Sequence, residues 1–330
     1  MSGQKNKPTV YVTREIPEKG LKLLEKECHV TVNRNSRSLG REELINNIKG
    51  IDGLVSMLSD PIDGGVIKSN PDLKVVANYA VGYNNIDVEA ATRQGVAVTN
   101  TPGVLTEATA DLTWALLMAV ARRIIESDQF VRQGQFKGWG PRLMLGSDVY
   151  GKTLGIIGFG RIGQAVARRA RGFNMEILYN KRTRLSRDRE EKLGVQYAEV
   201  DELLKRADYI SINAPLNKST YHLVGLQEFE LMKNTAIVIN TGRGPIIDES
   251  ALVEALKEGK IAGAGLDVYE EEPEVHPGLM ELDNVVLTPH TGSGTIETRD
   301  KMAVMVAEDV IAVLKGKRPA NLVNPGVYKN

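Results

Sequence analysis

The sequence contains a single cysteine, Cys28, among its 330 residues. An intrachain disulfide is therefore impossible, which fits a reducing compartment. The chain also lacks any run of about 20 apolar residues, so no membrane span is predicted. Its first residues lack the apolar core of a signal peptide, and a cytoplasmic location is expected.

An excess of charge of one sign is also missing. Lys and Arg together number 42, as do Asp and Glu together, so the formal net charge is zero. Nucleic acids and anionic membranes attract proteins with clustered positive charge, and neither partner is expected. The composition, 42% hydrophobic and 25% charged, is that of an ordinary globular protein, and the length is enough for two domains.

Strand and helix patterns alternate along the first hundred residues. This alternation predicts an α/β domain with a parallel sheet, with helices near residues 19–26 and 41–48. A turn signal at residues 100–103 ends it. A long helical pattern over about residues 108–131 and an irregular stretch at 133–148 follow. The predicted strands are Val10–Thr13, Val30–Asn33, Leu54–Met57, Leu73–Asn78 and Val96–Thr99.

A glycine-rich turn at residues 158–163 carries the clearest functional signal. Gly158, Gly160 and Gly163 form a G-x-G-x-x-G pattern between an apolar strand, 154–157, and a helix, 164–171. In a dinucleotide-binding unit these glycines allow the tight turn, the approach of the pyrophosphate and close helix–strand packing. A P-loop pattern at 146–153 is rejected because it leads into a strand rather than a helix.

The strand after this helix, 176–179, ends without an acidic residue. A carboxylate there usually binds the ribose 2′-hydroxyl of NAD. This chain instead has Asn180, Lys181, Arg182, Thr183 and Arg184. Guanidinium groups suit a phosphate, so the sequence predicts NADP(H) over NAD(H). An ordinary solvated basic loop is the alternative.

Four further strands are predicted, at 209–213, 236–240, 264–268 and 285–288, which makes a six-stranded doubly wound sheet. A helix is expected at 249–258, and a final helix at 296–314. Arg243, the acidic run 270–272 and His290 each follow one of these strands. Since ligands bind at the carboxyl ends of such strands, the three groups are expected to converge on one cleft. His29, His222 and His276 are expected to be structural or solvated, and no metal is expected.

As a set, these motifs resemble the D-isomer-specific 2-hydroxyacid dehydrogenases over nearly the whole chain. The segments SMLSDPID (56–63) and NKRTR (180–184) resemble the glyoxylate/hydroxypyruvate reductase branch, which includes 2-ketogluconate reductases. The other segments that carry the resemblance are VGYNNIDVEAATRQGVAVTNTP (81–102), LTEATADL (105–112), GFGRIG (158–163), NTGRGPIID (240–248), GLDVYEEEP (265–273) and TPHTGSGT (288–295).

The resemblance implies two doubly wound parallel-sheet domains. Residues 1–100 with 290–330 would form a discontinuous, flavodoxin-like substrate domain, and residues 101–289 a Rossmann dinucleotide-binding domain. Hinges near Thr101 and Pro289 would allow closure over the substrate. Residues 139–145 resemble the arm that reaches the partner subunit in the family's dimers, so a homodimer is expected.

The resemblance also assigns roles. Arg243 would bind the substrate carboxylate and carbonyl, His290 would be the acid in reduction and the base in oxidation, and Glu272 would pair with His290. The substrate contacts would be Arg243 with Leu58, Val81, Gly82 and Ser293, where Val81 and Gly82 offer backbone N–H groups. The cofactor contacts would be Thr106, Gly158, Phe159, Gly160, Arg161, Ile162, Gly163, Asn180, Lys181, Arg182, Thr183, Arg184, Ala214, Pro215, Thr241, Gly242, Asp267, His290 and Gly292.

The expected activity is NADPH-preferring reduction of small 2-oxo acids, glyoxylate and hydroxypyruvate, to D-2-hydroxy acids. Three alternatives stay open: a 2-ketogluconate reductase, an NAD-preferring relative that acts on phosphoglycerate, formate or phosphite, and a nucleotide-sensing corepressor-like protein on the same fold. Turnover assays separate the last from the enzymes. Pocket size, which depends on residues such as Leu58, Tyr83 and Trp139, does not fix the substrate from sequence.

Overall fold

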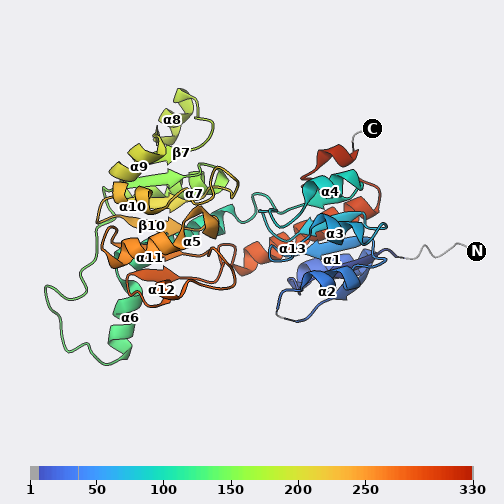
Figure 1. Cartoon of the computed structure of the whole chain (residues 1–330), viewed down its shortest axis with the longest axis horizontal. Helices are drawn as coiled ribbons and strands as arrows, with labels where there is room; N and C mark the ends of the chain where they lie inside the picture. Colours follow the sequence, from blue (N-terminus) through green and yellow to red (C-terminus); the bar gives the residue numbers. More distant parts are fainter. Residues whose placement is uncertain (1–6, 36, 329–330) are drawn as a thin grey trace, which may run out of the picture. The chain divides into compact units, whose positions relative to one another are not determined.

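The chain divides into two compact units in the computed structural model, which describes residues 7–35 and 37–328 (Figure 1). The first unit comprises Met1–Leu105 and Ser293–Asn330, and the second comprises Thr106–Gly292. The predicted bounds, after residue 100 and before residue 290, lie a few residues from these. Residues 1–6 and 329–330 of the expected substrate domain lie outside the described part.

The first unit is built on a five-stranded sheet in the order β2-β1-β3-β4-β5, with every pair parallel. An order of 2-1-3-4-5 is that of the flavodoxin-like doubly wound fold, as expected. Each predicted strand is present. The strands are β1 (Thr9–Val12), β2 (His29–Val32), β3 (Gly53–Ser56), β4 (Val75–Asn78) and β5 (Ala97–Thr99).

Helices cover both faces of this sheet. The helices α1 (Glu18–Glu27) and α13 (Ile296–Leu314) share one core, and α2 (Arg41–Asn47), α3 (Gly64–Lys68) and α4 (Val88–Arg93) share the other. A Cβ added to Gly20 of α1 would lie 2.5 Å from the carbonyl oxygen of Ala303, so glycine lets α1 and α13 approach closely. Leu322, which precedes η3 (Pro325–Tyr328), bridges to Thr99 of β5, so the C-terminal segment completes this unit.

The second unit carries a seven-stranded parallel sheet in the order β12-β11-β10-β9-β6-β7-β8. The order reverses between β6 and β9, as in the Rossmann fold. The expectation of six strands was short by one, because β8 has only two residues and leaves no periodic pattern. The strands are β6 (Thr153–Ile157), β7 (Glu176–Asn180), β8 (Gln196–Tyr197), β9 (Tyr209–Ile212), β10 (Ile237–Asn240), β11 (Gly263–Leu266) and β12 (Val285–Leu287).

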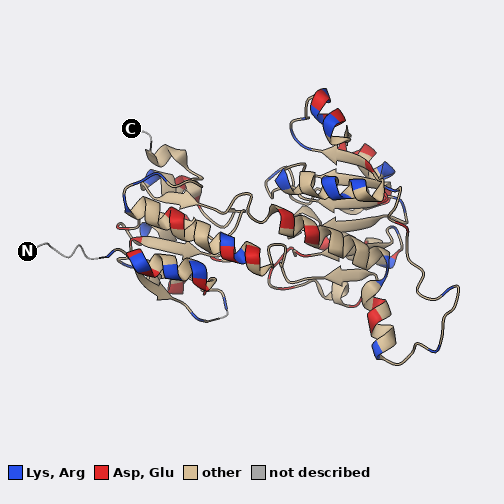
Figure 2. Cartoon of the chain, turned by 180° about the vertical axis from the view of Figure 1, so that it is seen from behind, with Lys and Arg blue, Asp and Glu red and all other residues tan. Residues whose placement is uncertain are grey.

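Two apolar cores flank this sheet. Side chains of α5 and α7 fill one core, and side chains of α9, α10, α11 and α12 fill the other. The helices are α5 (Thr106–Ala121), α7 (Arg161–Ala170), α8 (Arg187–Leu193), α9 (Val200–Arg206), α10 (Leu226–Leu231), α11 (Glu249–Lys257) and α12 (Pro277–Met280), with short 3₁₀ turns η1 (Arg171–Phe173) and η2 (Gly244–Ile246). Figure 2 shows both signs of charge on the same helices, in keeping with the neutral composition.

The expected single helix over residues 108–131 is wrong. The structure has two helices, α5 and α6 (Ile124–Arg132), separated at Arg123, whose φ of 51° breaks the α-helix. The Arg123 guanidinium donates hydrogen bonds to the Glu126 carboxylate and to the carbonyl oxygen of Leu145. After α6, the chain over residues 133–148 projects from the body of the second unit (Figure 1).

Candidate active site

The glycine loop lies between β6 and α7, at the point where the strand order reverses. Gly158 has a φ of +92°, and an added Cβ would lie 2.3 Å from the backbone nitrogen of Ala214. A Cβ on Gly163 would lie 2.4 Å from the carbonyl oxygen of Gly158. Gly160, directly before α7, has no atom within 4 Å of an added Cβ. Gly158 and Gly163 are thus needed for close backbone packing. Gly160 instead leaves open space beside a helix N-terminus, which fits a dinucleotide pyrophosphate.

The other predicted residues of this loop differ in exposure. The Phe159 ring is buried, with its centroid 4.5 Å from that of Tyr179, and therefore packs the loop against the core of the second unit. Arg161 is exposed and Ile162 half-buried on the first turn of α7. Ala214, buried against Gly158, and the exposed Pro215 follow β9, the strand next to β6.

The basic segment after β7 separates into two kinds of side chain. The Arg184 guanidinium donates two hydrogen bonds of 2.8 Å to the Glu190 carboxylate, which also accepts a 2.7 Å bond from the Tyr179 hydroxyl. Arg184 and Tyr179 together lower the pKa of Glu190 to about 2. Lys181 and Arg182 have no ion pair in the described part of the chain. Asn180 donates to the Ala198 carbonyl at 2.9 Å, and Thr183 is exposed.

Arg243 follows β10 in a loop that Asn240 holds in place. The Asn240 side chain donates to the carbonyl oxygen of Arg243 at 2.9 Å and accepts from the Gly242 backbone at 3.0 Å. The Thr241 hydroxyl lies 2.8 Å from that of Thr113 on α5. Burial lowers the pKa of Arg243, and the charge of Glu272 opposes this shift. A guanidinium is not deprotonated in proteins, so Arg243 stays cationic.

His290 and Glu272 form a hydrogen-bonded pair after β12 and β11. Nδ1 of His290 lies 2.8 Å from Oε2 of Glu272, and the backbone N–H of Tyr269 donates to Oε1 at 3.1 Å. Burial raises the pKa of Glu272, but His290, Tyr269 and Arg243 outweigh it and lower the pKa overall. His290 has a φ of +53°, a left-handed conformation of the kind that concentrates at functional sites.

Asp267 anchors the loop that presents His290. Its buried carboxylate accepts from the Thr288 hydroxyl at 2.6 Å and from the backbone N–H groups of Thr291 and Gly292, both at 2.7 Å. The resemblance placed Asp267, Gly292 and Thr106 among the cofactor contacts. In the structure, Asp267 holds both ends of the His290 turn, and Thr106 is half-buried at the start of α5.

A second histidine–carboxylate pair, which the sequence did not single out, lies beside these loops. Nε2 of His222 is 2.5 Å from Oε1 of Glu270, and the His222 backbone donates to the Pro245 carbonyl at 2.8 Å. The Glu270 backbone in turn donates to the buried Glu249 side chain at 2.7 Å. His222 therefore ties the segment after Arg243 to the segment before Glu272. No sequence motif marks this pair, because its members are 48 residues apart.

The remaining predicted substrate contacts belong to the first unit. Leu58 is exposed in the loop after β3, while Val81 and Gly82 are half-buried in the loop after β4. Ser293 is half-buried at the start of the C-terminal segment. The second unit thus brings together Arg243, Glu272 and His290 at the carboxyl ends of the adjacent strands β10, β11 and β12.

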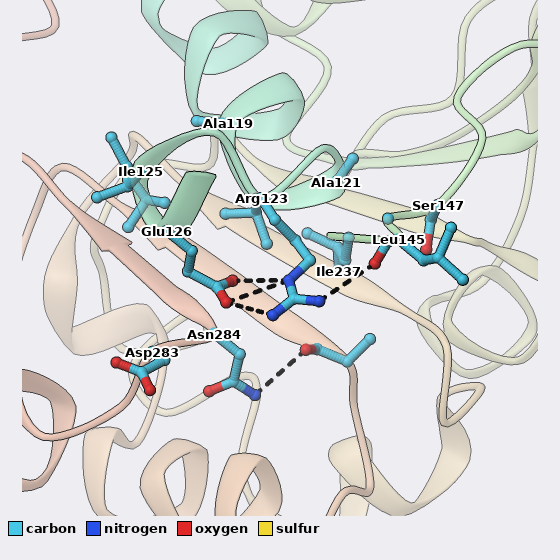
Figure 3. A pocket seen from close by; sticks show the side chains of 14 residues that line it. Ala119, Ala121, Arg123, Ile125, Glu126, Leu145, Ser147, Ile237, Asp283 and Asn284 are labelled. Atoms are coloured by element: carbon cyan, nitrogen blue, oxygen red, sulfur yellow. Dashed lines mark hydrogen bonds and ion pairs between the residues drawn. The ribbon is translucent and has the colours of Figure 1, made fainter. Parts of the chain in front are cut away.

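A cavity of about 460 Å³ lies at the opposite edge of the same sheet (Figure 3). Ile237, Ala262 and Asn284, which line it, stand at or before the amino ends of β10, β11 and β12. Figure 3 shows the Arg123 side chain held by Glu126 and by the backbone of Leu145 in its wall. None of the predicted site residues lines this cavity.

The described residues lack two further features. None of their helices is long and apolar enough to cross a membrane. No group of three or more His, Cys, Asp or Glu side chains in residues 7–35 and 37–328 is arranged to hold a metal ion.

Comparison with known proteins decides the family. The family model described as "D-isomer specific 2-hydroxyacid dehydrogenase, NAD binding domain" matches residues 114–292. The chain belongs to this family. As a D-isomer-specific 2-hydroxyacid dehydrogenase, it is an oxidoreductase with an NAD(P)-binding domain, and the predicted family and fold class are confirmed.

Relatives within the family cover nearly the whole chain. The chain is 52% identical to the glyoxylate reductase of Thermococcus litoralis, over 97% of this chain and 98% of that protein. A solved structure from Thermus thermophilus has a TM-score of 0.90 at 45% identity, covering 96% of this chain and 99% of that one. The NADPH-dependent glyoxylate/hydroxypyruvate reductase of Sinorhizobium meliloti, solved with NADP and malonate, has a TM-score of 0.87 at 31% identity, covering 98% and 99%. The relatives support reduction of 2-oxo acids by this chain.

Proposed function

We propose that this protein reduces glyoxylate and hydroxypyruvate to 2-hydroxy acids, of D configuration where the product is chiral, with NADPH preferred over NADH. The observation that carries the proposal is the His290–Glu272 pair beside Arg243, at the carboxyl ends of adjacent strands in a dinucleotide-binding sheet. The name of the T. litoralis relative supports glyoxylate as a substrate, and that of the S. meliloti relative supports both glyoxylate and hydroxypyruvate.

The site residues divide the chemistry between them. The bound nicotinamide supplies the hydride. Arg243 binds the carboxylate and carbonyl of the 2-oxo acid and stabilises the negative charge that develops on the carbonyl oxygen. His290 delivers the proton to that oxygen from Nε2, because Glu272 holds its Nδ1. In the reverse direction the same nitrogen accepts the proton.

The cofactor preference rests on the end of β7. Asn180 stands where an acidic residue would select NAD, and Lys181 and Arg182 offer cationic donors for a 2′-phosphate. Arg184 is a weaker candidate than the sequence indicates, since Glu190 occupies its guanidinium. The solved relative that holds NADP supports this preference.

A homodimer completes the proposal. The segment after α6 presents apolar side chains to solvent, among them Phe136, Leu145 and Trp139, whose exposure is 84%. Exposed apolar side chains concentrated on one segment mark an interaction surface. Sedimentation of the wild type and of Trp139→Ala with Phe136→Ala tests this point; a monomeric wild type contradicts it.

Product analysis tests the reaction itself. Incubation with hydroxypyruvate and NADPH, followed by chiral chromatography, should yield D-glycerate alone. L-glycerate, or no product from either 2-oxo acid, would contradict the proposal. His290→Asn serves as the control for enzyme-dependent product.

A further inference from the structure

Three consecutive carbonyl groups in the loop after β4 all accept hydrogen bonds. The Ala80 carbonyl accepts from the backbone N–H of Thr101 at 2.9 Å. The Val81 carbonyl accepts from the side-chain amide of Asn100 at 2.7 Å, and the Gly82 carbonyl from that of Asn78 at 2.8 Å. Successive peptide groups of this loop are therefore each fixed on the carbonyl side.

Fixing the carbonyl groups fixes the N–H groups as well. The described peptide bonds of this loop are trans, and a planar trans peptide points its N–H opposite to its C=O. The N–H groups of Val81, Gly82 and Tyr83 are therefore held pointing away from the residues that bind the carbonyls. In the described part of the chain, none of these three N–H groups has a hydrogen-bond acceptor. Backbone N–H groups without an acceptor are available to donate to an anion, as they do in other anion sites of proteins.

The two asparagines are themselves firmly placed. Asn78 is fully buried at the end of β4, and its side-chain oxygen accepts from the Ser56 hydroxyl on β3 at 3.0 Å. This contact leaves the amide nitrogen to face the Gly82 carbonyl. Asn100 follows β5 and donates its backbone N–H to the Asn321 carbonyl at 3.3 Å. Asparagine suits this role because its amide donates without ever carrying a charge that would repel or neutralise the anion.

We infer that Asn78 and Asn100 are positioning residues that hold the N–H groups of Val81, Gly82 and Tyr83 as a binding site for the carboxylate of the 2-oxo acid. The inference rests on the proposed function and deepens it. It adds the Tyr83 N–H as a third donor and explains why the loop needs two side-chain amides behind it. Hydrogen bonds from N–H groups to a carboxylate are charge-assisted and so stronger than neutral ones.

Asn100 offers the sharper test, because Asn78 is fully buried and its loss endangers the fold. Asn100→Asp keeps the size of the side chain but places an acceptor against the Val81 carbonyl, and Asn100→Ala removes the group. Asn70→Asp is the matched control, because this buried asparagine of the same unit donates to the carbonyls of Ile48 and Ile51, at 2.7 and 2.8 Å, and not to those of the loop.

Both Asn100 variants should raise the KM for glyoxylate and the inhibition constant of oxamate, a carboxylate analogue, by the same factor of about 10 to 100. The kcat at saturating glyoxylate and the Kd for NADPH should change less than about threefold, because other residues transfer the proton and bind the nucleotide. Asn70→Asp should lower the melting temperature but leave the KM unchanged.

Two results would overturn the inference. One is an unchanged KM in Asn100→Asp, and the other is an equal rise in KM in Asn70→Asp. Failure of the proposed function is a separate outcome, seen as a wild type that turns over no 2-oxo acid. In that case calorimetric titration with oxamate still tests whether the loop binds a carboxylate. Weaker binding of oxamate to Asn100→Asp than to wild type supports the inference, and equal binding overturns it.

Discussion

The Oε2 atom of Glu272 lies 2.8 Å from Nδ1 of His290, although the two residues follow different strands. The contact leaves Nε2 of His290 as the nitrogen able to exchange a proton with a substrate. It also keeps Glu272 ionised, because His290 and its neighbours lower the Glu272 pKa despite its burial. The proposed acid–base role of His290 depends on this pair.

Replacement of His290 by Asn should lower kcat by about 10²–10⁴-fold, the usual contribution of a positioned acid or base. NADPH binding, measured by fluorescence titration, should survive, since the glycine loop is untouched. Glu272→Gln should lower kcat less, as it keeps a hydrogen-bonding partner near Nδ1. An unchanged kcat in the His290 variant would rule out the assigned role.

The glycine loop predicts opposite outcomes for two similar substitutions. Gly158→Ala should destabilise the fold by about 1–3 kcal/mol or more, because the residue has a φ of +92° and its added Cβ would clash with the backbone of Ala214. Gly160→Val should leave the melting temperature nearly unchanged and weaken NADPH binding, since its side chain would enter open space. Thermal unfolding and nucleotide titration separate the two. Equal nucleotide affinity in Gly160→Val and wild type would contradict the assignment of that space to the pyrophosphate.

Lys181→Ala and Arg182→Ala should each reduce the ratio of kcat/KM for NADPH over NADH. A charge-assisted hydrogen bond is worth roughly 1.5–3 kcal/mol, so a loss of about 10- to 100-fold is expected for each single variant and a larger loss for the double variant. Arg187→Ala is a suitable control because Arg187 pairs with Glu191 on α8. If the double variant kept the wild-type ratio, the basic segment would be an ordinary solvated loop.

Stability in acid should depend on Glu190. Its folded pKa of about 2 lies below the ordinary 4.5, so its contribution is fully present above about pH 4.5 and is lost as the pH falls through that range toward 2. Glu190→Gln should therefore be less stable than wild type in urea unfolding at neutral pH, and the difference should shrink on acidification. Glu191→Gln, which alters an exposed pair, should show little effect. A difference that stays constant with pH would contradict the assignment.

The sequence predicted those parts of the molecule that leave a local pattern. The final helix over 296–314 and the strand–turn–helix around Gly158 were predicted from apolar periodicity and glycine spacing, and both are present. The two-residue strand β8 leaves no periodic pattern and was missed. The break at Arg123 was also missed, since Arg is a good helix former and the contacts that stabilise the break come from Glu126 and the distant Leu145.

The pairing of side chains from different segments could not be predicted from the sequence, for a similar reason. The sequence indicates that Arg184 binds a phosphate, but in the structure its guanidinium is hydrogen-bonded to Glu190 on the next helix. The contacts of His222 with Glu270 and of Asn100 with Val81 join segments that only the folded chain brings together. The ends of strands, by contrast, do leave a local pattern, which is why Arg243, the acidic run 270–272 and His290 were predicted to lie at one end of the sheet; only the family resemblance singled out Glu272 within that run.

Parallel assays of NADPH and NADH oxidation, each with glyoxylate and with hydroxypyruvate, test the proposed function most directly. We expect rapid oxidation of NADPH with either acid and slower oxidation of NADH. Tight NADPH binding without turnover of glyoxylate, hydroxypyruvate or 2-ketogluconate would contradict the proposal and would favour a nucleotide-sensing protein on the same fold.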